Sequence, residues 1–363
     1  MLWGDLITLE YGKPVKDKES KDGAVPVYGT NGQIGTSHLP PLCKHPSFIL
    51  GRKGAYRGVH YSEVPFSVID TAFFAEPISD KLNPKWAYYK FLTYDINRMD
   101  SGSAIPSTDR YEIYAIEVDL PDVSTQQRVV AVLDSIDQKI KANNKINDNL
   151  QQQALAIFQR ELLREGELPD GWTSSSLLDI ANYLNGLAMQ KFRPADGENG
   201  LPVLKIKELR QGSCDASSEL CSPNIKPEYI VHDGDVIFSW SGSLLVDLWC
   251  GGTCGLNQHL FKVTSEKYPK WVYYAWTAHH LARFVAIAAD KATTMGHIKR
   301  EELAKAEVVI PDASSMERIG SMLQPMYDLI ISNRIENRKL AALRDTILPQ
   351  LMSGEIDVSD IPL

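Results

Sequence analysis

Two stretches of this chain carry nearly the same sequence. LPDVSTQQRVVAVLDSIDQKIKANNKIN covers residues 120–147, and IPDASSMERIGSMLQPMYDLIISNRIEN covers residues 310–337. Identical residues recur throughout the stretch, including the pairs Asn143/Asn147 and Asn333/Asn337. A repeat with this wide a spacing is typical of a duplicated domain, because solenoid repeats recur every ~20–50 residues. The fold must therefore contain the same arrangement twice.

Shorter similarities precede each copy and keep the same order. The matched segments are VPVYG (25–29) with LPVLK (201–205), FILGRKGA (48–55) with VIFSWSGS (236–243), IDTAFF (69–74) with LNQHLF (256–261), and PKWAYY (84–89) with PKWVYY (269–274). Short β-rich runs separated by Gly, Pro and Asn, with a helix after each PKW, predict a mixed α/β (α+β) domain. The predicted domains are 1–119, a long helix and hinge at 120–168, 169–309, a second long helix at 310–352, and a tail at 353–363. The first copy has no counterpart of the strand-like segment around Trp172, so we expect it to begin truncated.

Each repeated segment predicts a long helix. Ser124 with Gln127, and Ser314 with Glu317, have the spacing of a capping box, which predicts Ser as the N-cap residue. About 40 residues follow, a helical length of ~60 Å. Pro325 lies inside the second segment, where it predicts a kink.

Apolar residues in both helices follow the 3-4 spacing of a coiled coil. The predicted seam consists of Val129, Leu133, Ile136, Ile140, Asn143, Asn147, Leu150, Ala154 and Ile157 in the first helix, and Ile319, Leu323, Met326, Ile330, Asn333, Asn337, Leu340, Arg344 and Ile347 in the second. Asparagines at matching mid-helix positions face each other in an antiparallel pair, so we predict that the two helices form an antiparallel coiled coil. The alternative is that these asparagines are solvated.

Composition indicates a soluble cytoplasmic protein. The chain has 363 residues, 44% of them hydrophobic, and no apolar run approaches the ~20 residues that span a bilayer. The start, MLWGDLITLEYGK, does not resemble a signal peptide. The five cysteines form no CxxC pair, and Cys250 and Cys254 have no second ligand pair nearby, so we expect no metal site.

Sequence motifs of catalysis are missing. The chain contains no GxxxxGK[ST] loop, GxGxxG turn, GxSxG elbow or HExxH pair. It also has no Asp/Asn-Pro-Pro-aromatic motif of the kind that amino-methyltransferases use. We therefore expect a protein that is not an enzyme and binds no cofactor itself.

A local basic patch stands out in a chain whose net charge is −8. Such a patch suits DNA phosphates and base edges, although a lone DNA-binding protein is normally basic overall. The alternative is a solvated loop. The DNA-contact candidates of the first domain are Lys44, Arg52, Lys53, Tyr56, Arg57, Ser107 and Arg110. Those of the second are Lys205, Lys207, Arg210, Ser241, Ser243, Thr294, His297, Lys299 and Arg300.

Taken together, the sequence resembles the specificity subunits of type I restriction-modification systems. Two divergent domains alternate with two similar helices, each entered through (L/I)PD-S/T followed by QQR or MER. The resemblance covers essentially the whole chain and is most specific over 118–158 and 308–352.

The resemblance implies that each globular domain is a target-recognition domain reading one half of a bipartite, asymmetric DNA site. The paired helices would act as a spacer. Two modification (methyltransferase) subunits and the restriction/translocase subunits would be the protein partners, and double-stranded DNA the ligand. S-adenosylmethionine, ATP and Mg would then bind the partner subunits. The rival interpretations are a coiled-coil scaffold whose side domains bind proteins, and a specificity subunit of a type IIB-like system.

Overall fold

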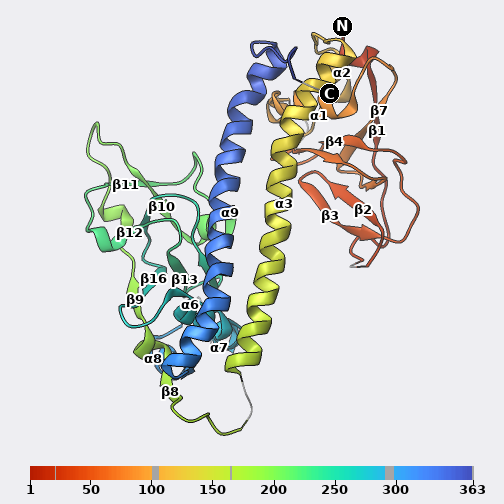
Figure 1. Ribbon diagram of the computed structural model, residues 1–363. Coiled ribbons are helices and arrows are strands. Elements are labelled where there is room, and N and C mark those ends of the chain that lie inside the picture. The colour runs from red at the N-terminus through yellow and green to blue at the C-terminus, as the bar shows by residue number, and fades with distance from the viewer. Residues whose placement is uncertain (21, 100–105, 164–165, 291–297, 362–363) are drawn as a thin grey trace. The chain divides into compact units, whose positions relative to one another are not determined.

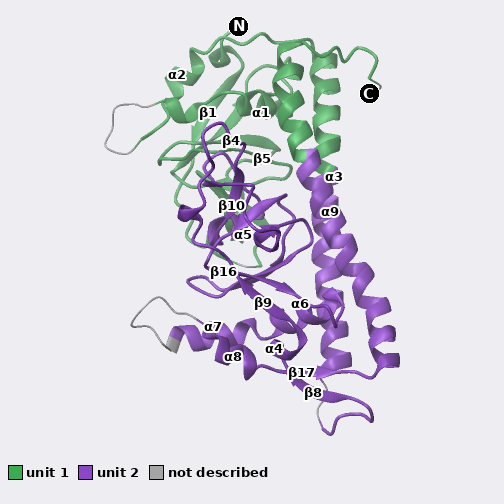
Figure 2. Cartoon of the chain, turned by 90° about the vertical axis from the view of Figure 1, so that its left-hand side faces the viewer, with its two compact units in different colours: residues 1–138, 341–363 green, residues 139–340 purple. Residues whose placement is uncertain are grey.

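The computed structural model describes residues 1–20, 22–99, 106–163, 166–290 and 298–361 (Figure 1). The chain forms two compact units (Figure 2). Unit 1 comprises residues 1–138 and 341–363, and unit 2 comprises residues 139–340. Each unit therefore contains one part of each long helix. The predicted domain boundaries, which kept the helices separate, stay a prediction.

Unit 1 contains two sheets. Its strands are β1 (Ile7–Tyr11), β2 (Val25–Gly29), β3 (Gly32–Ser37), β4 (Ser47–Gly51), β5 (Val59–Ser62), β6 (Ser67–Val68) and β7 (Ala72–Pro77). Its short helices are η1 (Trp3–Asp5), α1 (Pro84–Leu92), η2 (Ile96–Arg98) and α2 (Arg110–Tyr114). The larger sheet is antiparallel, with the order β1-β7-β4-β5, and the smaller has the order β3-β2-β6, with β2 and β6 parallel.

Unit 2 repeats this plan. Its strands are β8 (Thr173–Ser176), β9 (Asn182–Asn185), β10 (Leu201–Leu204), β11 (Leu220–Cys221), β12 (Ile230–Val231), β13 (Val236–Ser239), β14 (Leu245–Leu248), β15 (Cys254–Leu256), β16 (Leu260–Thr264) and β17 (Glu307–Ile310). Its short helices are α4 (Leu177–Ile180), η3 (Met189–Lys191), α5 (Ile206–Gln211), η4 (Pro227–Tyr229), α6 (Lys270–His279), α7 (Leu281–Asp290) and α8 (Arg300–Ala304). The order β9-β16-β13-β14 matches β1-β7-β4-β5, and β11-β10-β15 matches β3-β2-β6. The predicted duplication of a mixed α/β domain is confirmed.

The start of the first copy differs from expectation. Leu2 and Glu117 form an antiparallel bridge, and Trp3 N donates to Ile116 O at 3.1 Å. The β8–β17 pair of unit 2 begins in the same way, because Ser176 lies opposite Glu307. The first copy therefore has a counterpart of this strand pair, which corrects that part of the expectation, and the counterpart is shorter, as the expected truncation implied.

Strand register corrects one of the matched segments. Phe73 lies opposite Tyr11 and Leu50, whereas Phe261 lies opposite Asn185 and Phe238. The structural counterpart of Phe261 is therefore Phe73. The alignment of IDTAFF with LNQHLF was one residue out at this strand, because both copies contain several apolar residues in succession.

The two long helices are α3 (Val123–Leu162) and α9 (Ala313–Ser353). Asp122, and not Ser124, caps α3: its carboxylate accepts from Thr125 N at 2.9 Å. Asp312 likewise accepts from Ser315 N at 2.7 Å. The N-cap prediction was therefore two residues late in both helices, since an aspartate caps as well as a serine. Helix α9 continues through Pro325 without interruption, and the kink stays a prediction.

The helices pair antiparallel within each unit. In unit 1, Arg344 Nη1 donates to Asp137 Oδ1 at 2.8 Å, and Val129 and Leu133 share a core with Leu348. In unit 2, Ala154, Phe158 and Leu162 share a core with Ile319, Leu323, Tyr327 and Ile330. Of the predicted seam, Val129, Leu133, Ile136, Asn143, Asn147, Ala154, Ile319, Leu323, Ile330 and Asn333 are buried, and Ile140, Leu150, Ile157, Met326, Asn337, Leu340, Arg344 and Ile347 are partly buried. None of the helices in the described ranges has an apolar stretch sufficient to span a membrane.

The seam asparagines contact one another in a reciprocal way. Asn143 Nδ2 donates to Asn337 Oδ1 at 2.8 Å, and Asn333 Nδ2 donates to Asn147 Oδ1 at 2.9 Å. Because Asn333 and Asn337 are the repeat equivalents of Asn143 and Asn147, these contacts have the symmetry of a two-fold axis. Asn143 also donates to Glu336 Oε2 at 2.7 Å.

Replacing Asn143 by alanine should lower the free energy of unfolding by about 1–3 kcal/mol, because Asn337 Oδ1 and Glu336 Oε2 lose a hydrogen-bond donor. Asn149→Ala is the matched control, since Asn149 lies on the exposed face of the same helix. It should change stability by less than about 0.5 kcal/mol. Urea unfolding of both variants measures the difference, and equal effects would contradict a structural role for the network.

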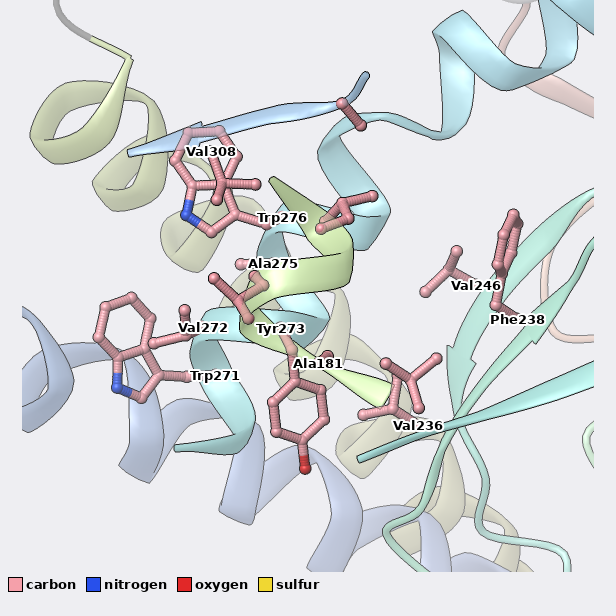
Figure 3. Close-up of a cluster of buried hydrophobic side chains, with 14 of the residues drawn as sticks. Ala181, Val236, Phe238, Val246, Trp271, Val272, Tyr273, Ala275, Trp276 and Val308 are labelled. Carbon is pink, nitrogen blue, oxygen red and sulfur yellow. The ribbon is translucent and has the colours of Figure 1, made fainter. Parts of the chain in front are cut away.

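A hydrophobic core packs between α6 and the sheet of unit 2 (Figure 3). Trp271, Val272 and Trp276 of α6 and Val236 and Phe238 of β13 are all fully buried. In unit 1, α1 contributes Trp86, Ala87 and Tyr89 to the corresponding core. The PKW segments therefore contribute the helix side of the core in each unit.

Candidate nucleic-acid interface

In unit 1, two arginines flank one tyrosine at the end of β1. The guanidinium carbon of Arg52 lies 4.8 Å from the centroid of the Tyr11 ring, and that of Arg110 lies 5.0 Å from it. Arg110 also donates from Nη2 to the Tyr111 hydroxyl at 3.1 Å, and its buried Nε has no hydrogen-bond partner. We call Tyr11, Arg52, Lys53, Arg110 and Tyr111 the basic–aromatic patch.

Backbone hydrogen bonds fix Arg52 from two sides. Its N–H donates to Thr71 O at 2.8 Å, and its carbonyl accepts from Thr108 N at 2.9 Å. Gly54 N donates to Pro106 O at 3.0 Å. Lys53 forms a bridge with Ser107, another of the predicted DNA contacts. The segment from Arg52 to Gly54 is thus held at defined places on its neighbours.

Positive charge dominates this patch. Lys53 Nζ lies 3.5 Å from Asp70 Oδ2, and Arg52 Nη1 donates to the backbone oxygen of Asp70 at 3.1 Å. The patch thus contains three cations, of which Lys53 pairs with the carboxylate of Asp70, in a chain whose net charge is −8. Tyr56 and Tyr111 are 66% and 64% exposed, and exposed aromatic rings beside cations suit contact with nucleic acid.

One predicted DNA contact of unit 1 lies in the interior instead. Arg57 is only 2% exposed. Its Nη2 donates to Asn97 O at 2.7 Å and its Nη1 to Thr108 Oγ1 at 3.1 Å. The expectation that Arg57 contacts DNA is corrected, because its guanidinium is buried and donates to groups inside unit 1. Lys44 is exposed.

Lysines of unit 2 are largely committed to neighbouring acids. Lys205 pairs with Glu219, and Lys207 Nζ lies 3.6 Å from Asp215 Oδ2. Arg210 is exposed. These contacts lower the positive potential that the lysines can offer to phosphates.

The remaining candidates of unit 2 fall in two places. Ser241 is 3% exposed and its Oγ lies 3.0 Å from His259 Nδ1, whereas Ser243 is exposed. Lys299 and Arg300 are exposed at the start of α8, where Arg300 lines a cleft. Thr294 and His297 lie outside the described residues.

Trp240, which the search for basic residues missed, occupies the matching site in unit 2. Its carbonyl accepts from Ile298 N at 3.0 Å, just as that of Arg52 accepts from Thr108 N. Its Nε1 donates to Asn185 Oδ1 at 2.9 Å. The alignment of GRKGA with SWSGS already placed Trp240 opposite Arg52, and this was the signal that could have identified it.

A metal site was not expected. Cys250 and Cys254 are both buried, as small apolar side chains usually are. Within the described ranges, the grouping of possible ligands is instead Cys43, His45 and Glu76. His45 Nε2 lies 2.6 Å from Glu76 Oε2, and burial raises the pKa of the Cys43 thiol to about 11. This thiol is therefore protonated at neutral pH.

Comparisons with known proteins agree with this architecture. A family model described as the type I restriction modification DNA specificity domain matches twice, over residues 3–152 and 169–343. The MjaIX specificity subunit of Methanocaldococcus jannaschii, a type I restriction enzyme subunit, is 24% identical over 309 residues, covering 78% of this chain and 71% of the relative. The HindI specificity subunit of Haemophilus influenzae is 18% identical and covers 80% and 81%.

A solved structure has the same fold. The S subunit of the type I restriction-modification system from M. genitalium superposes with a TM-score of 0.62 at 14% identity, over 97% of this chain and 95% of that chain. The family model accounts for most of the chain, and the resemblance noted from the sequence is confirmed. With two matches to the specificity domain, each extending into a long helix, this chain belongs to the type I restriction-modification DNA specificity family.

Proposed function

We propose that this chain reads a bipartite, asymmetric DNA site, with one recognition domain for each half-site. The observation that carries the proposal is a framework built twice, with different side chains at matching positions. The first copy presents Arg52 where the second presents Trp240. Different surfaces on equivalent frameworks suit two different base sequences.

The chain would provide the sequence specificity of a larger complex and would itself be non-catalytic. Modification subunits would bind to it and carry S-adenosylmethionine, and restriction subunits would carry ATP and Mg. The acidic balance of the chain supports this division, because phosphate contacts supply most of the affinity for DNA. Partner subunits would then provide the rest of the positive surface.

The lone chain should bind duplex DNA weakly, and specific binding should appear with a modification subunit. The net charge of −8 opposes tight binding, and the basic–aromatic patch is small. Gel-shift assays with the chain alone and with a co-purified modification subunit test this at a fixed salt concentration. A shift of the cognate duplex by the complex but not by the chain is expected.

Two other results would contradict the proposal. Tight sequence-specific binding by the lone chain at physiological salt would show that it needs no partner to recognise DNA. A complex that binds every duplex equally would favour a scaffold role. The matched control is the same duplex with one half-site scrambled.

A further inference from the structure

The two larger sheets present different side chains at one matched position. Arg52 follows β4 directly, and Trp240 follows β13 directly. The carbonyl of each accepts an equivalent hydrogen bond, from Thr108 N at 2.9 Å and from Ile298 N at 3.0 Å. The carbonyl of this position is therefore held in an equivalent way in both units, while the side chain changes from a cation to an aromatic ring.

Close chain crossings keep the two sites alike. Gly12 N donates to Ala72 O at 3.2 Å, and Gly186 N donates to Leu260 O at 3.0 Å. A Cβ at Gly12 would lie 2.0 Å from a backbone oxygen, and one at Gly186 would lie 2.3 Å from one. Glycine is thus required just after the end of β1 and of β9, next to Tyr11 and Asn185.

Arg52 and Trp240 each contact two neighbours, and these neighbours occupy equivalent positions in the two units. The guanidinium carbon of Arg52 lies 5.7 Å from the ring centroid of Phe73, and the Trp240 ring lies 5.7 Å from that of Phe261. The second neighbour is Tyr11 for Arg52, through a cation–π contact, and Asn185 for Trp240, through a hydrogen bond. Both second neighbours are accessible, since Tyr11 is 43% exposed and Asn185 is exposed.

We infer that this position selects a base pair in each half-site, an inference that rests on the proposed function. An arginine fork fits the O6 and N7 acceptors of guanine, so Arg52 gives unit 1 a guanine contact. The indole N–H of Trp240 donates to Asn185, and its ring packs against Phe261 and His259. Unit 2 thus carries an apolar ring at this position, and an apolar group fits the methyl group of thymine, so unit 2 takes an A·T pair.

The residues around this position also differ in charge between the two units. In unit 1 the neighbouring residues are Lys53 and Arg110, which add charge beside the guanine contact. In unit 2 the residue after Trp240 is Ser241, whose hydroxyl contacts His259. The guanidinium of Arg52 is already held over the Tyr11 ring, so less conformational entropy is lost when it forms a bidentate contact with a base.

Genome-wide methylation mapping of cells that carry the complete restriction-modification system tests the inference. Arg52→Ala should reduce discrimination at one position of one half-site by roughly 5- to 160-fold, which corresponds to ~1–3 kcal/mol for a bidentate pair. Trp240→Ala should relax one position of the other half-site. Arg98→Ala and Phe192→Ala are matched controls, because both side chains are exposed and lie outside the two sites. They should leave the recognised sequence unchanged.

Each possible outcome is decisive. If Arg52→Ala does not fold, Arg52→Lys replaces it in the test, because lysine keeps the charge but lacks the fork. If Trp240→Ala does not fold, Trp240→Phe replaces it. Full methylation of the unchanged sequence in folded variants at both positions overturns the inference. Changes in both half-sites from one substitution also overturn it. Absence of sequence-specific methylation with the wild-type chain would instead refute the proposed function.

A transplant provides the positive test. Trp240→Arg combined with Asn185→Tyr rebuilds the Arg52–Tyr11 pair on the framework of unit 2. The second half-site should then gain a guanine preference at the position that Trp240→Ala relaxes. Retention of the original base at that position by the folded double variant would count against the inference.

Discussion

Replacing Arg334 by alanine is expected to lower the stability of unit 2 by about 3–5 kcal/mol, the usual effect of removing one partner from a buried ion pair. Arg334 Nη1 and Nη2 donate to the two carboxylate oxygens of Asp247, at 2.8 Å and 2.7 Å. Nη1 also donates to Leu248 O at 2.8 Å. The side chains of Arg334 and Asp247 are only 22% and 20% exposed. Removal of the guanidinium leaves the mostly buried carboxylate of Asp247 without its cationic partner, and Leu248 O loses a charged donor.

Urea unfolding followed by the fluorescence of the unit 2 tryptophans measures this effect. Arg160→Ala is the control, since that side chain is 66% exposed and its partner Glu161 keeps Arg318, at 2.8 Å. The control should cost less than about 1 kcal/mol. A double variant, Arg334→Met with Asp247→Leu, should recover much of the loss, because paired apolar replacements remove both charges. Equal midpoints for Arg334→Ala and the control would show that the pair does not support unit 2.

The anchoring role of α9 in unit 2 extends to a second arginine. Arg338 donates to both carboxylate oxygens of Asp233, at 2.8 Å each. This contact, above all, lowers the pKa of Asp233 below its usual value. The repeat equivalents of Arg334 and Arg338 in α3 are Asn144 and Asp148. The repeat therefore could not predict these anchors, because they occur in one copy only.

The helices were predictable because their information is local. A 3-4 spacing of apolar residues specifies the buried face of a helix whatever it packs against. The antiparallel direction followed from the two asparagine pairs, which meet reciprocally only in that arrangement. The cap was misplaced because Asp122 and Ser124 are both good N-cap residues, and the sequence alone does not say which of them leaves the helix.

The candidate site was less predictable because charge in a sequence does not reveal which way a side chain faces. Arg57 follows Arg52 and Lys53 closely in the chain, yet its guanidinium is buried against Asn97 and Thr108. Trp240 was passed over because it carries no charge. The alignment of GRKGA with SWSGS already placed it opposite Arg52, and the strand registers of the two units support that match, which matters because a one-residue slip reverses the face of every side chain in a strand.

Lengthening both helices by one heptad at the division between the units should widen the gap between the half-sites by about three base pairs. The division falls after Gln138 in α3 and after Leu340 in α9. Contacts on either side of it, such as Asp137 with Arg344 in unit 1 and Asn143 with Asn337 in unit 2, lie within one unit each. Seven residues inserted at both points therefore keep the seam in phase and leave the internal contacts of each unit unchanged.

The expected widening of the gap follows from the rise per residue of a helix and the rise per base pair of DNA. Seven helical residues add ~10.5 Å at 1.5 Å each, and base pairs are ~3.4 Å apart. Three additional base pairs also turn the duplex by about a third of a turn, given 10–10.5 per turn, so one recognition domain would meet its half-site on another face. Three inserted heptads add ~31.5 Å, or about nine base pairs, and bring the half-sites close to their original relative orientation.

Methylation mapping of the two insertion variants separates spacing from rotation. If the helices set the spacing, the variant with three heptads should methylate a site whose half-sites are unchanged and whose gap is about nine base pairs longer. The variant with one heptad should be weaker because of the rotation. A heptad inserted only after Leu340 is the control, because it shifts one helix against the other and should destabilise the pair. Full methylation at the original gap by the variant with three heptads would show that the helices do not measure the distance, since rods longer by ~31.5 Å could not place both domains on half-sites that have not moved.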